Sequence, residues 1–544
     1  MYYLKNFETA LHWVGDRYSD LLDASEQGFY SDFSALPLES RALLVRLIMR
    51  KGDLFRESKI VYPEIGDTRR ASEPLIERGW MDPRPSLTIG ELFKLLTRTE
   101  LAGMFDVLQT GVRKSAALSA LQSAGSECRP LDDWRRVRSA GEPDERVFRV
   151  TVAPLCARFR ILFFGNFRQE WSEFVLADLG VFRYEKIEFS CDSRAFQTRQ
   201  DIEELYVLYQ CREDFYADKA PAEVLAKLPR SRLSNDWLEG RRAKLLFQLA
   251  QAFERAGDPD LAAGLYADSS HPGARLRRIR LMELMGRHAA ARDLADLAFQ
   301  RPHGEAERQK LLRIQARLDQ RLQGKKAAPA RRHVPERLDL TLPPPEPDTG
   351  VEFAVLAHLS TPDAPIFYVE NALINSLFGL LFWDAIFAAV RGAFYHPFQS
   401  GPADLYSAEF QARRQPCFDR GFAALRADAH RDVIRRNFHD KHGIQSPFVF
   451  WGPLSETLLE LALDCIPALH LRCCFERLLA NIDENRSGLP DLIQFWPATR
   501  RYRMIEVKGP GDRLQDNQLR WMSFCAQHQI PVAVCHARWS GFIQ

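Results

Sequence analysis

The stretch GLPDLIQFW runs from Gly488 to Trp496, and YRMIEVKGPG follows it from Tyr502 to Gly511. Both are rich in branched and aromatic apolar residues, and turn-forming residues separate them. Such a pattern is typical of strands, so we expect strands over Leu489–Phe495 and Tyr502–Lys508.

Alternation along the second strand predicts how its charged residues are presented. Successive side chains on a strand point to opposite faces, which places Glu506 and Lys508 together and Val507 in the core behind them. A neighbouring strand can bring Asp491 beside Glu506. We therefore expect two carboxylates and one ammonium group in a single patch.

Such a patch suits the cleavage of phosphodiesters. Carboxylate oxygens are ligands for Mg²⁺ or Mn²⁺, and a lysine can orient an attacking water or stabilise charge on the phosphate. The short pattern alone also fits a turn followed by a solvated strand edge. The turn over 509–512 and a helix from about Asp516 to His528, with Gln518 in its first turn, favour the catalytic interpretation.

The run GLPDLIQFW, taken with MIEVKGPGDRLQDNQLRW, strongly resembles the virus-type replication-repair nuclease (VRR-NUC) domain. That domain is a branch of the PD-(D/E)xK nuclease fold, so the resemblance implies an α/β nuclease domain. We expect one or two Mg²⁺ or Mn²⁺ ions on Asp491, Glu506 and the Val507 carbonyl. Lys508 would position the nucleophile. Gln518 and Arg513 would touch the metal-bound water or the phosphate.

A third acid is expected from the segment YVENALINSLFGLLFWDAIF. We predict one long apolar helix over Tyr368–Phe387 with Glu370 at its N-terminal end. An acid there also complements the helix dipole. The pattern is similar to the helix that lends a third carboxylate to the metal in large VRR-NUC nucleases, so Glu370 is expected to be a ligand. Asp384 lies roughly 20 Å further along the helix and cannot share that ion.

The bulk properties limit the class of protein. A chain of 544 residues forms several domains, and its net charge of +2 means that nucleic-acid binding must come from local basic patches. The ten cysteines form no CxxC pair, which favours reduced thiols over a zinc ribbon or a disulfide framework. No secretory segment is seen, and polar residues interrupt the apolar run 373–390. We expect a soluble cytoplasmic protein.

The chain is predicted to be multidomain and mainly α-helical, ending in the α/β nuclease domain. We expect a helical, winged-helix-like domain over 1–80, a SAP-like hairpin with an extension over 81–215, and helical repeats over 216–323. A proline-rich linker over 324–350 would precede the nuclease domain at 351–544.

The segment Leu87–Leu121 reads as a helix, a loop at Thr110–Gly111 and a second helix. It loosely resembles a SAP motif, a small hairpin that binds the DNA backbone. Arg113 stands where that family usually has a glycine, and Leu118 lies one residue later than the leucine of the family pattern. The plain alternative is a two-helix packing element. If the hairpin binds DNA, its phosphate-facing residues are Lys94, Arg98, Arg113 and Lys114.

The segment 216–323 carries a weak internal echo, with glycine turns at Gly257 and Gly286 followed by small residues. This suggests degenerate tetratricopeptide-like helical pairs that form a scaffold or partner surface. An arginine-rich face that includes Arg275 and Arg278 makes contact with DNA the alternative.

These parts occur together in the Fanconi-associated nuclease family. The resemblance implies a monomeric, structure-specific enzyme, a 5′-flap endonuclease and 5′–3′ exonuclease that leaves 5′-phosphates during DNA interstrand crosslink repair. Its partner would be branched DNA. Two alternatives remain: a DNA-binding scaffold whose nuclease fold is vestigial, and a nuclease that resolves four-way junctions.

Overall fold

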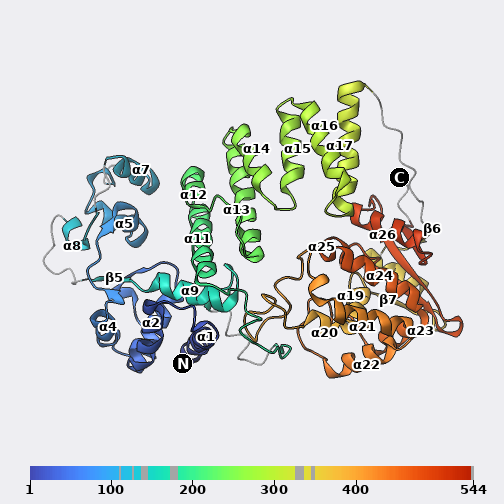
Figure 1. The fold of residues 1–544 in the computed structure, drawn as a ribbon, viewed down its shortest axis with the longest axis horizontal. Coiled ribbons are helices and arrows are strands. Elements are labelled where there is room, and N and C mark those ends of the chain that lie inside the picture. The colour runs from blue at the N-terminus through green and yellow to red at the C-terminus, as the bar shows by residue number, and fades with distance from the viewer. Residues whose placement is uncertain are drawn as a thin grey trace. The chain divides into compact units, whose positions relative to one another are not determined.

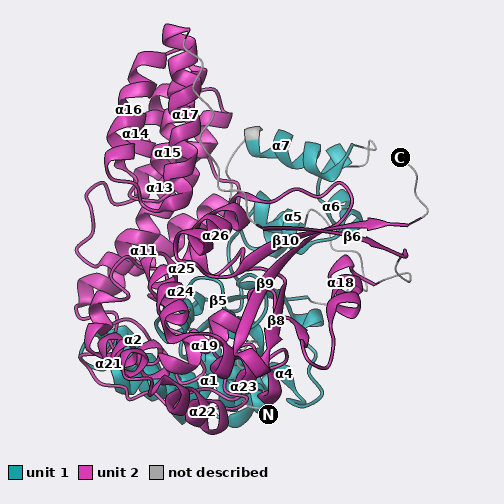
Figure 2. Cartoon of the chain, turned by 90° about the vertical axis from the view of Figure 1, so that its right-hand side faces the viewer, with its two compact units in different colours: residues 1–181 teal, residues 182–544 magenta. Residues whose placement is uncertain are grey.

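A computed structural model describes residues 1–108, 112–124, 128–135, 145–171, 182–324, 336–344 and 349–540. The chain divides into two compact units, Met1–Val181 and Phe182–Gln544, coloured teal and magenta in Figure 2. Helices dominate both units, and the second unit ends in a mixed sheet (Figure 1), which confirms the predicted fold class.

A helical bundle with a small sheet opens the first unit. Tyr3, Phe7, Leu11 and Val14 recur at helical spacing and are buried, so the first helix presents one apolar face to its neighbours. The helices are α1 (Tyr2–Tyr18), α2 (Ala24–Ala35), α3 (Leu38–Ile48), α4 (Thr68–Glu77) and α9 (Ala153–Phe164). The antiparallel sheet has the order β1 (Leu54–Arg56), β5 (Val147–Val150), β2 (Met81–Asp82).

The SAP-like part differs from the expected pair of helices. Thr97 ends the first helix early because it caps a new one: its Oγ1 accepts the Glu100 N–H, and the Glu100 carboxylate accepts the Thr97 N–H. The expected loop at Thr110–Gly111 lies outside the described residues. The elements are β3 (Leu87–Thr88), α5 (Ile89–Leu95), α6 (Arg98–Ala102), α7 (Lys114–Ala124), β4 (Cys128–Arg129) and α8 (Leu131–Trp134).

Successive helices form the first part of the second unit. Gly257 and Gly286 adopt φ angles of 86° and 72° and turn the chain between neighbouring helices, while Ala262 and Ala291 are buried where the helices meet. The helices are α11 (Arg199–Tyr216), α12 (Pro221–Lys227), α13 (Asp236–Arg255), α14 (Pro259–Asp268), α15 (Ala274–Leu284), α16 (His288–Gln300) and α17 (Glu305–Gln323).

The sheet of the second unit has five strands in the order β6-β10-β9-β8-β7. They are β6 (Glu336–Leu342), β7 (Ile366–Tyr368), β8 (Leu492–Trp496), β9 (Arg501–Lys508) and β10 (Val532–Trp539). Strand β10 is parallel to β6 and β9, whereas β8 is antiparallel to both of its neighbours, β7 and β9. The region expected to be a linker, 324–350, therefore contains an edge strand of this sheet.

Helices separate the strands of this sheet along the chain. They are α18 (Val351–Leu359), α19 (Leu373–Leu381), α20 (Trp383–Ile386), α21 (Gln415–Arg426), α22 (His430–Asp440), α23 (Glu456–Cys465), α24 (Ala468–Ala480), α25 (Ile482–Asn485) and α26 (Asp516–Gln527). Phe378, Phe382 and Phe475 form an aromatic cluster in their core.

The prediction of one helix over Tyr368–Phe387 was wrong. Tyr368 ends strand β7, and Glu370 lies in a turn in which Asn371 has a φ of 53°. The helix begins only at Leu373 and is interrupted at Phe382. Apolar residues at this density suit a buried strand, a turn and a helix equally well, so the pattern did not reveal the break.

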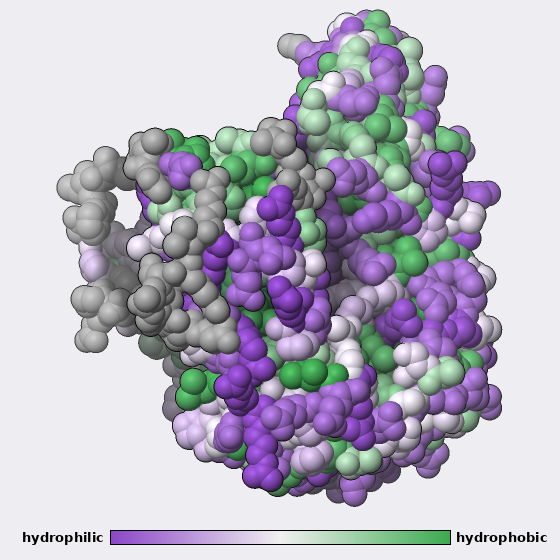
Figure 3. Space-filling view, turned by 90° about the vertical axis from the view of Figure 1, so that its left-hand side faces the viewer, coloured by the Kyte–Doolittle hydropathy of each residue, from purple (hydrophilic) through white to green (hydrophobic). Residues whose placement is uncertain are grey.

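On the face shown in Figure 3, hydrophilic side chains form much of the described surface and apolar ones appear in separate patches. Within the described part of the chain, no helix is both long and apolar enough to cross a bilayer.

Candidate active site

Strands β8 and β9 bring two acids face to face. Leu492 pairs with Ile505 in antiparallel register, so the next residues, Asp491 and Glu506, lie opposite each other. Strand β8 begins at Leu492 and not at Leu489, which leaves Asp491 just before its first residue.

Glu506 contacts a lysine and a glutamine, whereas Asp491 accepts a hydrogen bond from the backbone of β9. Asp491 Oδ2 accepts the Val507 N–H at 2.8 Å. Glu506 Oε1 lies 2.7 Å from Lys508 Nζ and accepts a hydrogen bond of 2.6 Å from Gln518 Nε2. Asp491 and Lys508 are each 8% exposed and Glu506 is fully buried. The sequence-predicted patch of two carboxylates and one ammonium group is therefore present.

The first turn of α26 fixes the orientation of Gln518. The Gln515 N–H donates to Gln518 Oε1 at 2.8 Å, so the amide nitrogen is left to face Glu506. This turn packs closely on the chain before Asp491: a Cβ on Gly488, whose φ is 87°, would lie 2.9 Å from Asn517 backbone and side-chain atoms. Only glycine fits there.

Burial makes both carboxylic acids weaker. Removal from water raises the pKa of Asp491 to about 6, against the opposing effects of the Val507 N–H and the Lys508 charge. The same cause, reinforced by the neighbouring Asp491 carboxylate, raises the pKa of Glu506 to about 7. A cation placed between the two carboxylates would relieve this repulsion.

Glu370 faces the same region from the turn after β7. Its charge contributes to the raised pKa of Asp491, as does that of Glu352 in the first turn of α18. Its Oε2 accepts a hydrogen bond from the Tyr368 hydroxyl. Sequence reasoning overlooked Tyr368 and Glu352; the acid at the start of a helix gave no signal beyond ordinary dipole complementarity.

The donor set fits a hard divalent cation in part. Glu506 Oε2 is buried and accepts no hydrogen bond from the described residues, although a carboxylate oxygen in such a place needs a proton or a cation. Across the described residues, no three His, Cys, Asp or Glu side chains are grouped to hold a metal together. Asp491 and Glu506 are thus assembled with each other, and Glu370 is not joined to them in one set.

The expected DNA-contacting residues fall into two groups. Lys94, Arg98, Arg113 and Arg513 are exposed. The others are engaged or partly buried. Lys114 Nζ donates to the Leu96 carbonyl at 2.8 Å, Arg275 forms an ion pair with Glu307, and Arg278 is partly buried.

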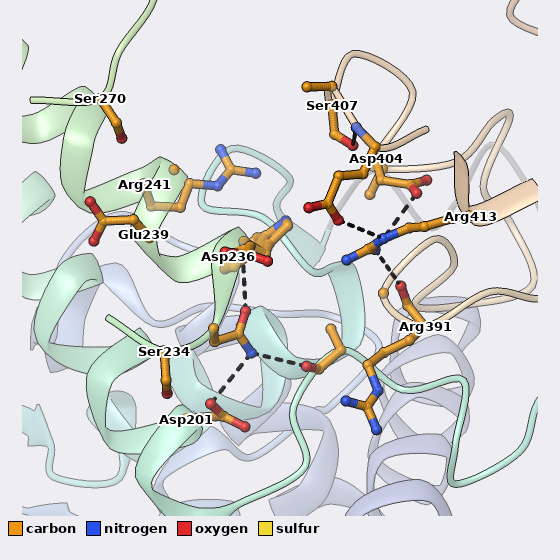
Figure 4. A pocket seen from close by; sticks show the side chains of 18 of the residues that line it. Asp201, Ser234, Asp236, Glu239, Arg241, Ser270, Arg391, Asp404, Ser407 and Arg413 are labelled. Carbon is orange, nitrogen blue, oxygen red and sulfur yellow. Dashed lines mark hydrogen bonds and ion pairs between the residues drawn. The ribbon is translucent and has the colours of Figure 1, made fainter. Parts of the chain in front are cut away.

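A cavity of about 810 Å³ lies elsewhere in the second unit, between the start of α13 and the segment 391–413 (Figure 4). Its charged walls are largely paired: Glu239 bonds Arg242, and Asp404 bonds Arg414, with Arg413 nearby. None of the predicted site residues lines it.

Comparison with known proteins gives matches along the whole chain. Family profiles match the VRR-NUC domain at residues 425–539, the FAN1 HTH domain at 1–82 and the Fanconi anemia-associated nuclease SAP domain at 86–134. The Fanconi-associated nuclease 1 homolog of Pseudomonas aeruginosa is 54% identical over 99% of this chain and 96% of its own. The Arabidopsis thaliana homolog is 24% identical over 100% of this chain and 67% of its own.

A solved structure is similar over the same extent. The crystal structure of paFAN1 bound to a 2-nucleotide 5′-flap DNA with a gap has a TM-score of 0.87 and 52% identity, and the match covers 100% of this chain and 99% of that one. The complex of the same protein with a 1-nucleotide flap matches equally well.

Proposed function

The chain belongs to the family of Fanconi-associated nuclease 1 homologues, and we propose that it cuts branched DNA in an active site formed by Asp491, Glu506 and Lys508. The proposed cofactor is Mg²⁺ or Mn²⁺. Family membership makes the chain a structure-specific nuclease, a hydrolase of phosphodiester bonds that acts in DNA repair. The observation that carries the proposal for the site is the joint burial of two carboxylates and one ammonium group on adjacent strands.

Each residue has a distinct proposed role. Asp491, Glu506 and the Val507 carbonyl would hold the ion, with Glu370 turning in from its loop. A bound divalent ion supplies polarisation of the phosphate and a lower pKa for water. Lys508 orients the attacking water and stabilises charge on the phosphate, while Gln518 keeps the Glu506 carboxylate in one orientation.

The proposed substrate is a 5′ flap. The similar paFAN1 structures hold 5′-flap DNA, and this chain matches them over its full length. Endonucleolytic cutting near the flap, degradation from a 5′ end, products with a 5′-phosphate, and action on interstrand crosslinks belong to the same proposal. Lys94, Arg98 and Arg113 would contact phosphates through the SAP-like part, and Arg513 would do so beside the active site.

One assay tests this function. The purified chain is incubated with end-labelled 5′-flap, 3′-flap, four-way-junction and single-stranded DNA, with Mg²⁺, Mn²⁺ or EDTA. We expect metal-dependent cutting that is fastest on the 5′ flap. Cutting that persists in EDTA, or preference for the four-way junction, would contradict the proposal.

Three substitutions test the site: Asp491→Ala, Glu506→Ala and Lys508→Ala. Each is expected to lower the cleavage rate by about 10³-fold or more, because each removes a charged group that is proposed to hold the cation or to act on the water and the phosphate. Binding of flap DNA in Ca²⁺ or EDTA should stay within about twofold. Arg503→Ala, which lies on the same strand outside the patch, is the matched control. A variant that cuts at the wild-type rate removes that residue from the mechanism.

A further inference from the structure

The helical region α11–α17, here called the helical repeat, contacts the first turn of α26 directly through its last helix. Arg313 on α17 forms a fork to Asp516, the first residue of α26: NH1 donates to Oδ2 at 2.7 Å and NH2 to Oδ1 at 2.6 Å. A fork of two parallel hydrogen bonds fixes direction as well as distance. Figure 1 shows α17 running down to α26.

A second set of contacts keeps α17 in place. Glu305, its first residue, forms an ion pair of 2.6 Å with Arg477, and the Ala306 N–H donates to Glu484 Oε2 at 3.0 Å. A Cβ on Gly304 would lie 2.6 Å from Glu484 Oε1, so the chain enters α17 in close contact with the nuclease domain. Helix α17 is therefore held against the nuclease domain both at its first turn and at Arg313.

Asp516, which accepts the two hydrogen bonds of the fork, lies two residues before Gln518, which contacts the proposed catalytic residue Glu506. Asp516 and Gln518 share the first turn of α26, and Gln518 Nε2 bonds Glu506 Oε1 at 2.6 Å. The same turn packs against Gly488 through Asn517, with no room for a Cβ on the glycine. A displacement of this turn would therefore change the position of Gln518 relative to Glu506.

We propose that Arg313 is a positioning residue of the nuclease: through Asp516 it holds the start of α26 so that Gln518 keeps the Glu506 carboxylate in its working orientation. The inference rests on the proposed role of Glu506 in cleavage. It makes the helical repeat part of the machinery that sets the active-site geometry, because a misplacement of about 1 Å at a reacting group costs up to 10²-fold in rate.

Single-turnover cleavage of a 5′ flap tests this role in Arg313→Ala, Asp516→Ala and the double variant. We expect each single change to slow cleavage about tenfold, with DNA affinity in Ca²⁺ within about twofold of wild type. The double variant should be no slower than the slower single one, because both remove the same contact. Arg313→Lys should recover part of the rate, since lysine keeps the charge without the fork.

Arg317→Ala is the matched control. Arg317 lies one turn further along α17 and forms the same kind of fork, at 2.9 and 2.7 Å, to Glu283 inside the repeat. Its loss should leave the rate within about twofold. Equal losses in Arg313→Ala and Arg317→Ala, a wild-type rate in Arg313→Ala, or an effect confined to DNA affinity would overturn the proposal.

Amide hydrogen exchange gives a readout that does not depend on cutting. Without DNA or metal, exchange of the backbone amides at 517–520 should be faster in Arg313→Ala than in wild type, and unchanged in Arg317→Ala. Unchanged exchange in Arg313→Ala would overturn the positioning role even if cleavage is impaired. Cleavage that survives in Asp491→Ala would instead overturn the assignment of the catalytic patch.

Discussion

At the scale of single residues, the carboxylates of Asp491 and Glu506 are neighbours in a place that water barely reaches, and this determines how they titrate. Burial raises the pKa of Asp491 to about 6 and that of Glu506 to about 7. Each carboxyl group therefore keeps its proton to a higher pH than an exposed acid does, and a proton competes with a cation for the same oxygens.

This competition predicts the pH dependence of cleavage. Below pH 7 Glu506 and then Asp491 become protonated, so at a fixed, subsaturating Mn²⁺ concentration the cleavage rate should fall as the pH drops from about 7.5 to 5.5. More Mn²⁺ should shift the profile to lower pH, because the cation displaces the protons. Single-turnover rates on a 5′ flap across this range measure it. A profile that does not move with Mn²⁺ would contradict the shared use of these oxygens.

Residue patterns also mark the limit of what the sequence could predict about the site. Asp491, Glu506 and Lys508 come together as expected because alternation and antiparallel register are local rules. The surroundings of Glu370 were not predictable in this way, since the turn at Asn371 depends on a left-handed backbone inside an apolar run. Nor could the sequence show that Arg275 is paired with Glu307, because the partner comes from another helix.

At the scale of elements, α26 and the loop before Asp491 act as one packed unit. Gly488 lies so close to Asn517 that a side chain on residue 488 would clash with Asn517. The position of Gln518 over Glu506 therefore depends on the absence of a single methyl group at Gly488.

Gly488→Ala tests that dependence. It should destabilise the protein by about 2–4 kcal/mol, since strain at a φ of 87° adds to overpacking, and it should lower the cleavage rate. Gly511→Ala is the matched control, because Gly511 has a φ of 89° but open space around its Cβ position. It should cost only about 1 kcal/mol. Equal losses of stability in urea unfolding would show that the close contact is unimportant.

Strand β6 is the element that the sequence did not reveal. Its prolines on either side are typical of a spacer, whereas its partner β10 lies far away along the chain, with Glu336 opposite Ala533. Patterns within a short window carry no information about such a partner. Leu342 at its end is 3% exposed and belongs to the core formed with Val355 and Leu492.

Leu342→Ala should therefore destabilise the nuclease domain by about 2–4 kcal/mol, as expected for a buried leucine. Thr341→Ala, at the exposed neighbouring position, should change stability by less than about 0.5 kcal/mol. Chemical denaturation followed by tryptophan fluorescence measures both. Two equally stable variants would mean that β6 behaves as a linker.

At the scale of the whole molecule, a net charge of +2 leaves DNA affinity to local basic residues. The described part of the SAP-like region presents Lys94, Arg98 and Arg113 to solvent, whereas several arginines of the helical region α11–α17 form ion pairs. The fold class, mainly helical with a mixed sheet in the C-terminal domain, was predictable because helices and strands each carry their own local pattern. The commitment of individual charges was not, because it depends on which helices become neighbours.

The triple change Lys94→Ala, Arg98→Ala and Arg113→Ala is expected to weaken binding of flap DNA. If all three contact phosphates, the slope of log K against log salt should become shallower by about 2 to 3, at roughly 0.9 for each contact. Arg277→Ala is the control, since its guanidinium bonds Glu254 at 2.9 Å. Fluorescence anisotropy between 50 and 200 mM salt measures the slope, and an unchanged slope would remove these residues from the DNA interface.

The order of strands in the nuclease sheet also bears on how the enzyme folds. Strand β10 lies between β6 and β9, and its Val534 pairs with Glu506. Strand β6 therefore has no partner in the sheet until β10, nearly two hundred residues later in the sequence, has been synthesised and pairs with it. Pairings between strands so far apart in the sequence form slowly, so we expect this sheet to be completed later than the helical parts of the chain that precede it.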